Sequence, residues 1–241
     1  MKNWIQRWYL RLFKGRYYGR HRFDINTYLD LIPVGSLCFD VGANKGEKTK
    51  ALLASGMRVV AFEPQPDCVS FIHQHCEGFS KELKVVQTAV GNETGSITLY
   101  QTDVPGHASV FEDWSSDETK NQIDVPMTTL REAIAAHGAP TYCKVDVEGF
   151  EVAVFEGLDQ LIPYVSFEYH MNEKGLVKVM DCLEVLSRFG SLELNLISAE
   201  RNQLIWPEWK SIDEFNKKFP DAFRGNRDFR YGDIFVRTLK K

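Results

Sequence analysis

Short apolar runs of strand length alternate with segments of helical pattern between residues 37 and 170. The first three runs cover 37–41, 57–62 and 83–90, and helical patterns at 46–54 and 67–76 separate them. A strand that returns to its sheet through a helix lies parallel to the strand before it, and such helices cover both faces of the sheet. The alternation therefore predicts a doubly wound α/β fold with a mostly parallel sheet.

The rest of the chain continues this pattern with four more apolar runs, at 142–147, 162–169, 191–197 and 231–236. A helix with capping-box spacing from Thr129 to Glu132 should end near Gly138, and an amphipathic helix should cover 176–189. The turn-forming residues 91–95 and the alternating run 96–101 predict an antiparallel ribbon. Residues 103–122 are polar and irregular, and 206–230 look like an insertion. The apolar runs together predict about seven main strands.

The charge of the chain is distributed unevenly. The net charge is −4, but the first 22 residues carry seven basic residues and no acid, so the remainder sums to about −11. An acidic body disfavours a general nucleic-acid binder, which usually presents a basic face. The basic and aromatic N-terminal arm, residues 1–35, suits a helix packed on the body, an acceptor lid, a subunit contact or a peripheral contact with anionic lipid. Residues 36–241 are long enough for one domain.

Cysteine usage and hydropathy bear on the compartment of the protein. The five cysteines are an odd number without C-x-x-C spacing, so they predict neither a disulfide framework nor a zinc site. No stretch approaches the roughly 20 apolar residues that span a bilayer, and the N-terminus lacks the apolar core of a secretory signal. We expect a cytoplasmic protein, with the inner face of the membrane as the alternative location for the arm. The oligomeric state is not predicted.

A glycine loop joins the first strand to the first helix, with the sequence Phe39-Asp40-Val41-Gly42-Ala43-Asn44-Lys45-Gly46. This is the position at which doubly wound sheets bind ligands. Gly42 and Gly46 permit positive φ and a close approach of the backbone, and Asp40 can accept hydrogen bonds from a cationic amino group. A nicotinamide fingerprint would require a glycine where Asn44 stands. A nicotinamide-dependent oxidoreductase is thus the disfavoured alternative.

Glu63 ends the second strand and precedes Pro64. A carboxylate at this position can accept hydrogen bonds from both hydroxyls of an adenosine ribose. The alternative is a tight turn with a solvated acid at the end of a strand.

The chain resembles the FkbM-type methyltransferases through the glycine loop, Phe62-Glu63-Pro64, and Lys144-Val145-Asp146-Val147-Glu148-Gly149-Phe150-Glu151. The similarity covers roughly residues 36 to 170. It implies S-adenosylmethionine as cofactor and a seven-stranded, Rossmann-like methyltransferase sheet whose last strand is antiparallel. It also implies methyl transfer to an oxygen of a saccharide, glycan or natural-product hydroxyl.

The resemblance also implies roles for individual residues. Glu63 would hold the ribose, and Ala89 would lie on the adenine side. The residues near the methionine end of the cofactor would be Asp40, Gly42, Ala43, Asn44, Gly46 and Thr49. Ser109 falls in a stretch that would close over the acceptor. Two interpretations of Ser109 are equally open: it binds an acceptor hydroxyl, or it is an ordinary loop residue.

Ionisable side chains follow the fourth and fifth strands of the predicted sheet. Asp146 and Glu148 are two residues apart, as are Glu168 and His170, so each pair shares a face while the strand continues. A base near the acceptor can take its proton during methyl transfer, which makes Asp146, Glu168 and His170 candidate catalytic residues. His170 has the more suitable ordinary pKa, near 6.5. Glu148 is a candidate acceptor-binding residue, or a cap of the helix that begins at Gly149.

A divalent metal ion held by these carboxylates and the histidine is an alternative that we do not predict. A non-catalytic binding protein with the same fold is a second alternative. The sequence thus predicts an S-adenosylmethionine-dependent O-methyltransferase that acts on a small-molecule or glycan acceptor and does not bind nucleic acid.

Overall fold

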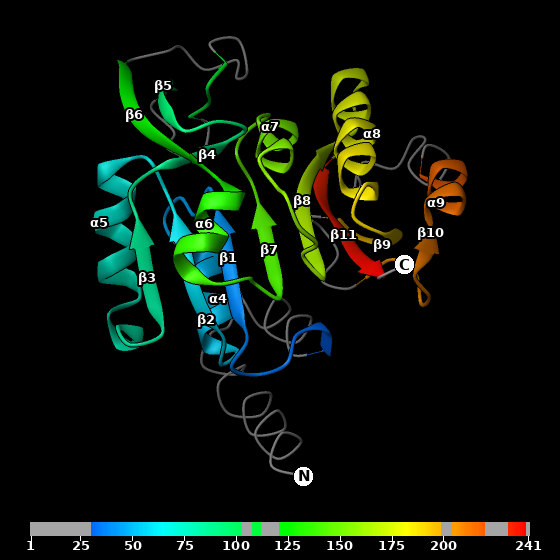
Figure 1. Ribbon diagram of the computed structural model, residues 1–241, viewed down its shortest axis with the longest axis horizontal. Coiled ribbons are helices and arrows are strands. Elements are labelled where there is room, and N and C mark those ends of the chain that lie inside the picture. The colour runs from blue at the N-terminus through cyan, green and yellow to red at the C-terminus, as the bar shows by residue number, and fades with distance from the viewer. Residues whose placement is uncertain (1–29, 103–107, 112–120, 199–203, 220–230, 240–241) are drawn as a thin grey trace.

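A mostly parallel sheet lies between two layers of helices in the computed structural model (Figure 1), which describes residues 30–102, 108–111, 121–198, 204–219 and 231–239. The main sheet has eight strands in the order β10-β9-β11-β8-β7-β1-β2-β3. Their bounds are β1 Leu37–Val41, β2 Arg58–Phe62, β3 Leu83–Val86, β7 Tyr142–Val145, β8 Tyr164–His170, β9 Ser191–Ser198, β10 Lys210–Ser211 and β11 Tyr231–Leu239. Seven of these strands match the predicted runs. The two-residue edge strand β10, within the segment interpreted as an insertion, is new.

Strand directions confirm the predicted fold class. The strands from β3 to β8 pair in parallel, whereas β11 pairs antiparallel with both β8 and β9. The last strand therefore inserts in the opposite direction between its neighbours, as expected for a Rossmann-like methyltransferase sheet.

Helices cover both faces of this sheet. The helices are α4 Glu47–Ala54, α5 Pro66–His75, α6 Leu130–His137, α7 Glu151–Glu156, α8 Glu173–Ser187 and α9 Ile212–Lys218, with a short 3₁₀ turn at Glu77–Phe79. Apolar residues of α6, α7 and α8 pack on one face around Phe39, Val145 and Phe167. Those of α4 and α5 pack on the other face around Cys38, Ala61 and Tyr142. Successive strand residues thus alternate between two cores.

A second, smaller sheet lies beyond the carboxyl ends of the parallel strands, at the upper left of Figure 1. It consists of β4 Ala89–Gly91, β5 Gly95–Gln101 and β6 Asn121–Thr129, in the order β4-β6-β5. The predicted single run 83–90 is therefore wrong, because the chain leaves β3 at Val86 and enters the second sheet at Ala89. The predicted ribbon exists, but its second strand is β6, which begins at Asn121 inside the segment interpreted as irregular.

The N-terminal arm lies outside the described residues as far as residue 29, so its predicted contacts stay predictions. Among the residues that the structure describes, no helix combines the length and the apolar character that crossing a membrane requires.

Candidate active site

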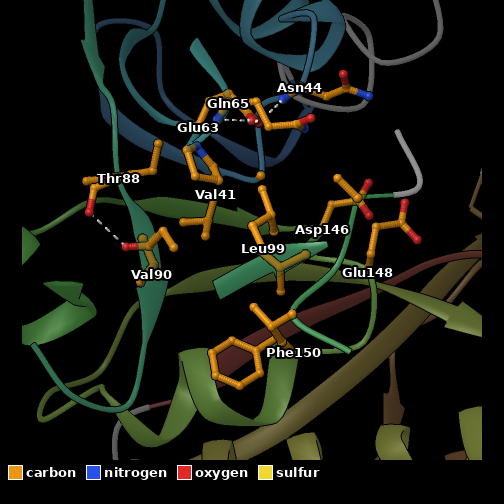
Figure 2. Close-up of a pocket in the computed structure, with 17 residues that line it drawn as sticks. Val41, Asn44, Glu63, Gln65, Thr88, Val90, Leu99, Asp146, Glu148 and Phe150 are labelled. Carbon is orange, nitrogen blue, oxygen red and sulfur yellow. Dashed lines mark hydrogen bonds between the residues drawn. The ribbon is translucent and has the colours of Figure 1, made fainter. Parts of the chain in front are cut away.

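Parallel pairing aligns the ends of β1, β2 and β7 at one edge of the sheet, and a pocket opens there (Figure 2). The space within it, including the part open to solvent, is about 680 Å³. Its walls include Gly42, Asn44, Glu63, Thr88, Ala89, Leu99, Asp146, Glu148 and Phe150. Residues from the glycine loop, the end of β2, the second sheet and the segment after β7 therefore meet around one cavity.

The glycine loop has the positive φ angles predicted at its two glycines, and Asn44 adds a third that the sequence did not predict. Gly42, Asn44 and Gly46 all have positive φ, at 78°, 47° and 79°. The loop is held to its neighbours, because the Gly42 and Ala43 amides both donate to the Phe62 carbonyl, at 3.0 and 3.1 Å. Gly42 and Asn44 line the pocket, whereas Ala43 and Gly46 do not.

Asp40 and Thr49 lie behind the loop rather than in the pocket wall. Both are buried, and the Thr49 hydroxyl donates a hydrogen bond to the Asp40 carboxylate. Burial raises the pKa of Asp40, although the Thr49 hydrogen bond and the nearby Lys144 oppose this shift. In this arrangement Asp40 braces the loop against α4, and the predicted contact of both residues with the cofactor stays a prediction.

Glu63 is fixed in place at one end of the pocket. Its side chain is buried, and its two oxygens accept hydrogen bonds from the Asn44 amide at 2.7 Å and the Gln65 amide at 2.9 Å. Burial raises the pKa of Glu63, and these amide hydrogen bonds partly offset the shift. The oxygen that accepts from the Gln65 amide also accepts from the Gln65 side-chain amide, at 3.4 Å, whereas the other oxygen accepts from the Asn44 amide alone. One ligand hydroxyl can therefore donate directly to Glu63, and a second would replace the long hydrogen bond from the Gln65 side chain.

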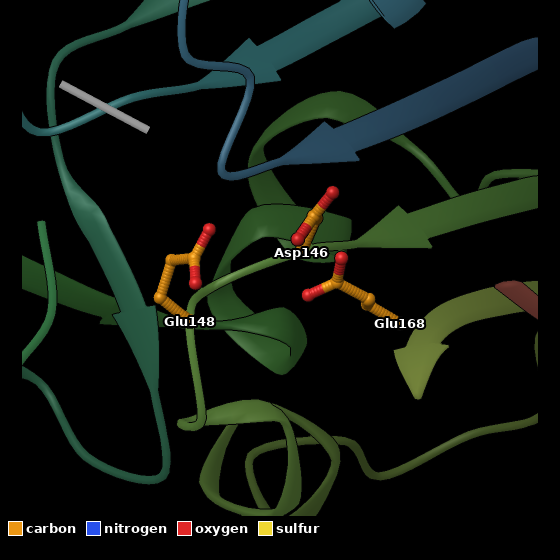
Figure 3. Close-up of side chains that lie close together, drawn as sticks. All are labelled: Asp146, Glu148 and Glu168. Carbon is orange, nitrogen blue, oxygen red and sulfur yellow. The ribbon is translucent and has the colours of Figure 1, made fainter. Parts of the chain in front are cut away.

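Three carboxylates converge beside the pocket, on β8 and the segment after β7 (Figure 3). Oxygens of Asp146, Glu148 and Glu168 all lie within 4.8 Å of one another. Asp146 and Glu148 line the pocket, and Glu168 lies beside them on β8. Carboxylate oxygens are the ligands that Mg²⁺ and Ca²⁺ prefer, so the metal alternative would use these three residues.

Ser109 fastens the second sheet to this acidic segment. Its buried hydroxyl donates to the Glu148 carbonyl at 2.8 Å and accepts from the Phe111 amide at 3.1 Å. The proton of the Ser109 hydroxyl is therefore engaged in a hydrogen bond within the protein. Glu148 itself has a positive φ of 50°, and the Ser109 hydrogen bond helps to hold this backbone conformation.

Lys144 and Asp233 complete the site, and neither is among the residues predicted from the sequence. The Lys144 side chain is 1% exposed, and its ammonium group contacts Asp146 at 3.1 Å and Asp233 at 2.7 Å. These carboxylates keep the pKa of Lys144 well above its usual value in spite of burial. A lysine within the apolar run 142–147 was the available signal, because a buried lysine requires an anionic partner.

His170 forms an ion pair with Glu168. Its Nε2 atom lies 2.9 Å from the Glu168 carboxylate, and this hydrogen bond raises the pKa of His170. The charged pair stabilises the folded protein below the pKa of an unfolded histidine. This contribution is lost as the pH rises through the higher pKa of the folded state.

Glu168→Gln is expected to lower the pKa of His170, because the anionic partner is removed while the shape of the side chain is kept. An NMR titration of the imidazole Cε1–Hε1 signal measures the change, and the titration of His137 on α6 serves as the control. An unchanged pKa of His170 would contradict the pairing.

The comparisons with known proteins agree with this architecture. The model of the FkbM methyltransferase domain matches residues 40–200, which is more than half of the chain. No curated protein matches the sequence.

Solved structures of methyltransferases are similar in fold. An O-methyltransferase from Bacillus cereus, solved in complex with SAH, has a TM-score of 0.50 at 8% identity, covering 92% of this chain and 81% of that one. A precorrin-6Y C5,15-methyltransferase from Geobacter metallireducens has a TM-score of 0.44 at 11% identity, with 86% and 83% covered. A TehB-like SAM-dependent methyltransferase from Corynebacterium glutamicum has a TM-score of 0.43 at 15% identity, with 94% and 98% covered.

The family match favours a methyltransferase over the nicotinamide-dependent oxidoreductase that Asn44 already disfavoured. It also covers the glycine loop, Glu63 and the acidic segment after β7. The chain belongs to the FkbM methyltransferase domain family and is an S-adenosylmethionine-dependent methyltransferase.

Proposed function

We propose that the protein transfers a methyl group to a hydroxyl oxygen of a saccharide, glycolipid or natural-product-like acceptor. The observation that carries this proposal is the convergence of Asp146, Glu148 and Glu168 beside the pocket, with His170 on Glu168. Such a group can accept hydrogen bonds from several hydroxyls and can take the proton of one of them. Its negative charge disfavours phosphate-rich acceptors, so we expect no nucleic-acid partner.

The pocket residues fit the cofactor of this class. Glu63 would hold the two ribose hydroxyls, Ala89 and Leu99 would border the base, and the loop at Gly42 and Asn44 would border the amino-acid end. When bound, S-adenosylmethionine supplies a methyl group on a cationic sulfonium. The fixed carboxylate of Glu63 needs little reorganisation to accept the ribose, which favours binding.

The acceptor hydroxyl would lie at Asp146, the candidate catalytic residue that lines the pocket. Lys144 holds one oxygen of Asp146 from the sheet side, which restricts the carboxylate to one orientation. The proton of the acceptor hydroxyl would pass to this cluster of carboxylates and histidine during the transfer. His170 would be the strongest base of the cluster at a pH above the pKa of its imidazole. Close and in-line placement of the oxygen is the main requirement of the reaction.

A labelled-methyl assay against a panel of sugars and cell-envelope extracts, with product identification by mass spectrometry, tests the proposal. Label on a saccharide or glycolipid hydroxyl is the expected result. Label found only on protein, nucleic acid or amines would overturn the assignment of the acceptor.

Asp146→Ala is expected to lower the rate of transfer to that acceptor by about 10²–10⁴-fold, the usual range for removing a group that handles the reacting proton. The measurement is the initial rate at saturating cofactor, with the exposed Asp159→Ala as control. The reaction would have to occur elsewhere if Asp146→Ala and His170→Ala both kept wild-type turnover.

A further inference from the structure

A continuous row of side chains leads from the pocket along the carboxyl edge of the sheet. Asp146 lines the pocket, Glu168 lies within 4.8 Å of it, and His170 contacts Glu168 at 2.9 Å. The His170 ring then stacks on Tyr231, with 6.3 Å between ring centroids and 24° between planes. The row thus begins at Asp146, where the acceptor hydroxyl would lie, and ends at an aromatic ring.

Strand register explains why Tyr231 is part of this row. Tyr231 begins β11 and is the partner of His170 across the antiparallel pair of β11 and β8, and paired residues project from the same face of a sheet. Tyr231 is 47% exposed, and it belongs to none of the three apolar clusters of the described residues. A large apolar ring is therefore presented to solvent beside an ionised pair.

The chemistry of this row matches a sugar ring. A saccharide has an apolar face of C–H groups, which packs against an aromatic ring, and a rim of hydroxyls, which donate hydrogen bonds to carboxylates. The carboxylates of Glu148 and Glu168 would repel a phosphorylated or carboxylated acceptor. An exposed ring next to carboxylates therefore selects a neutral, hydroxyl-rich ligand.

We infer that Tyr231 and His170 form the platform of an acceptor subsite, on which a neutral saccharide ring lies while one of its hydroxyls reaches Asp146. This inference rests on the proposed function and adds Tyr231 as a residue that determines acceptor affinity. The ring on the platform can be the methylated unit or the unit next to it in a longer glycan.

Acceptor kinetics of Tyr231 variants test the inference, with the saccharide that receives most label in the panel as the probe. Tyr231→Ala is expected to raise the KM for this saccharide about tenfold, which corresponds to the loss of one good aromatic contact. Tyr231→Phe keeps the ring and should stay within about threefold of wild type. Tyr231→Leu keeps apolar bulk without a flat face and should resemble Tyr231→Ala.

Two controls separate a contact with the acceptor from a change in folding. Calorimetry with S-adenosylhomocysteine should give the wild-type Kd for all three variants, because Tyr231 does not line the cofactor pocket. Phe71→Ala removes an aromatic ring of similar exposure, 41%, from α5 and should leave the KM unchanged. Saturation-transfer NMR in the S-adenosylhomocysteine complex should show magnetisation reaching the ring protons of the saccharide in wild type and much less in Tyr231→Ala.

The outcomes separate this inference from the proposed function. If wild type methylates a saccharide and Tyr231→Ala keeps its KM, the platform is wrong and the proposed function stands. If wild type labels only a hydroxyl outside a saccharide ring, the platform is wrong and the proposed function stands. If it labels no hydroxyl acceptor, both fall, and the wild-type panel alone reveals it.

Discussion

Gly42→Ala is expected to weaken cofactor binding severely and to destabilise the fold, which makes it one of the two largest effects that we predict. A Cβ atom at this position would lie 1.8 Å from the backbone oxygen of Asp146 and 3.2 Å from Cγ1 of Val147. The carbonyl cannot easily move, because the Asp146 amide donates to the Val41 carbonyl at 2.9 Å. Forced separation of the two segments would therefore deform the pocket at the point where the glycine loop meets the acidic segment after β7.

The expected loss of stability combines two costs. Overpacking costs about 1–3 kcal/mol, and a positive φ at a residue with a Cβ atom adds about 1–2 kcal/mol. Urea unfolding measures the stability, and calorimetry with S-adenosylhomocysteine should show a more than 100-fold weaker affinity, equivalent to about 2.8 kcal/mol.

Gly35→Ala is the matched control for Gly42→Ala. Gly35 has a similar φ of 88°, but a Cβ atom there would meet nothing within 4 Å. This variant should show only the cost of the positive φ, with unchanged affinity for S-adenosylhomocysteine. Wild-type affinity in Gly42→Ala would contradict the close packing of the two segments.

Glu63→Ala is expected to weaken S-adenosylhomocysteine binding by more than about 100-fold. Hydrogen bonds to a charged group are each worth about 1.5–3 kcal/mol, and the two ribose hydroxyls would lose their acceptor together. The Asn44 and Gln65 amides would also lose their partner, which loosens the loop on the pocket side. Glu63→Gln keeps one acceptor oxygen and should give an intermediate Kd.

A cofactor analogue separates the lost ribose contact from the loosened loop. The 2′-deoxy form of S-adenosylhomocysteine should bind wild type more weakly than the parent compound, and this difference should vanish in Glu63→Ala. Glu77→Ala, at an exposed glutamate outside the pocket, is the control and should bind both compounds as wild type does. A discrimination that survived in Glu63→Ala would mean that another residue holds the ribose.

Helix ends show how much of the fold follows from local sequence. The predicted helix from Thr129 to Gly138 corresponds to α6, in which the Thr129 hydroxyl accepts from the Glu132 amide at 3.2 Å. Capping and the 3.6-residue period depend on neighbours in sequence, so they can be recognised without a structure. The same reasoning found seven of the eight strands of the main sheet.

Strand partners do not follow from local sequence. The apolar run 83–90 has uniform strand character, yet the structure divides it between two sheets. The run 96–101 pairs with β6 across a segment that has no recognisable pattern from 103 to 120. Pairing between distant segments depends on the packing of the whole fold, and a period of two specifies a strand but not its partner.

The residues of the candidate site likewise fall into those that sequence motifs predict and those that only the structure reveals. Motifs at strand ends predicted the positions of Gly42, Glu63, Asp146 and Glu148 at one pocket, because parallel strands end at the same edge of a sheet. The pairing of Lys144 with Asp233 joins residues that are 89 positions apart. It requires β11 to lie beside β8, so only the order of strands reveals it.

The sequence by itself therefore determined the layers of the fold, the family, and the loop and acids that surround the pocket, since each depends on short patterns of residues. Tertiary structure decided which side chains are buried or hydrogen-bonded within the protein and which are exposed to solvent. It buried Lys144 against two carboxylates, brought the Ser109 hydroxyl into a hydrogen bond with the Glu148 carbonyl, and paired Tyr231 with His170 across two strands. The physical reason is that burial, hydrogen bonding and strand register arise between segments distant in sequence, and they exist only once the chain has folded.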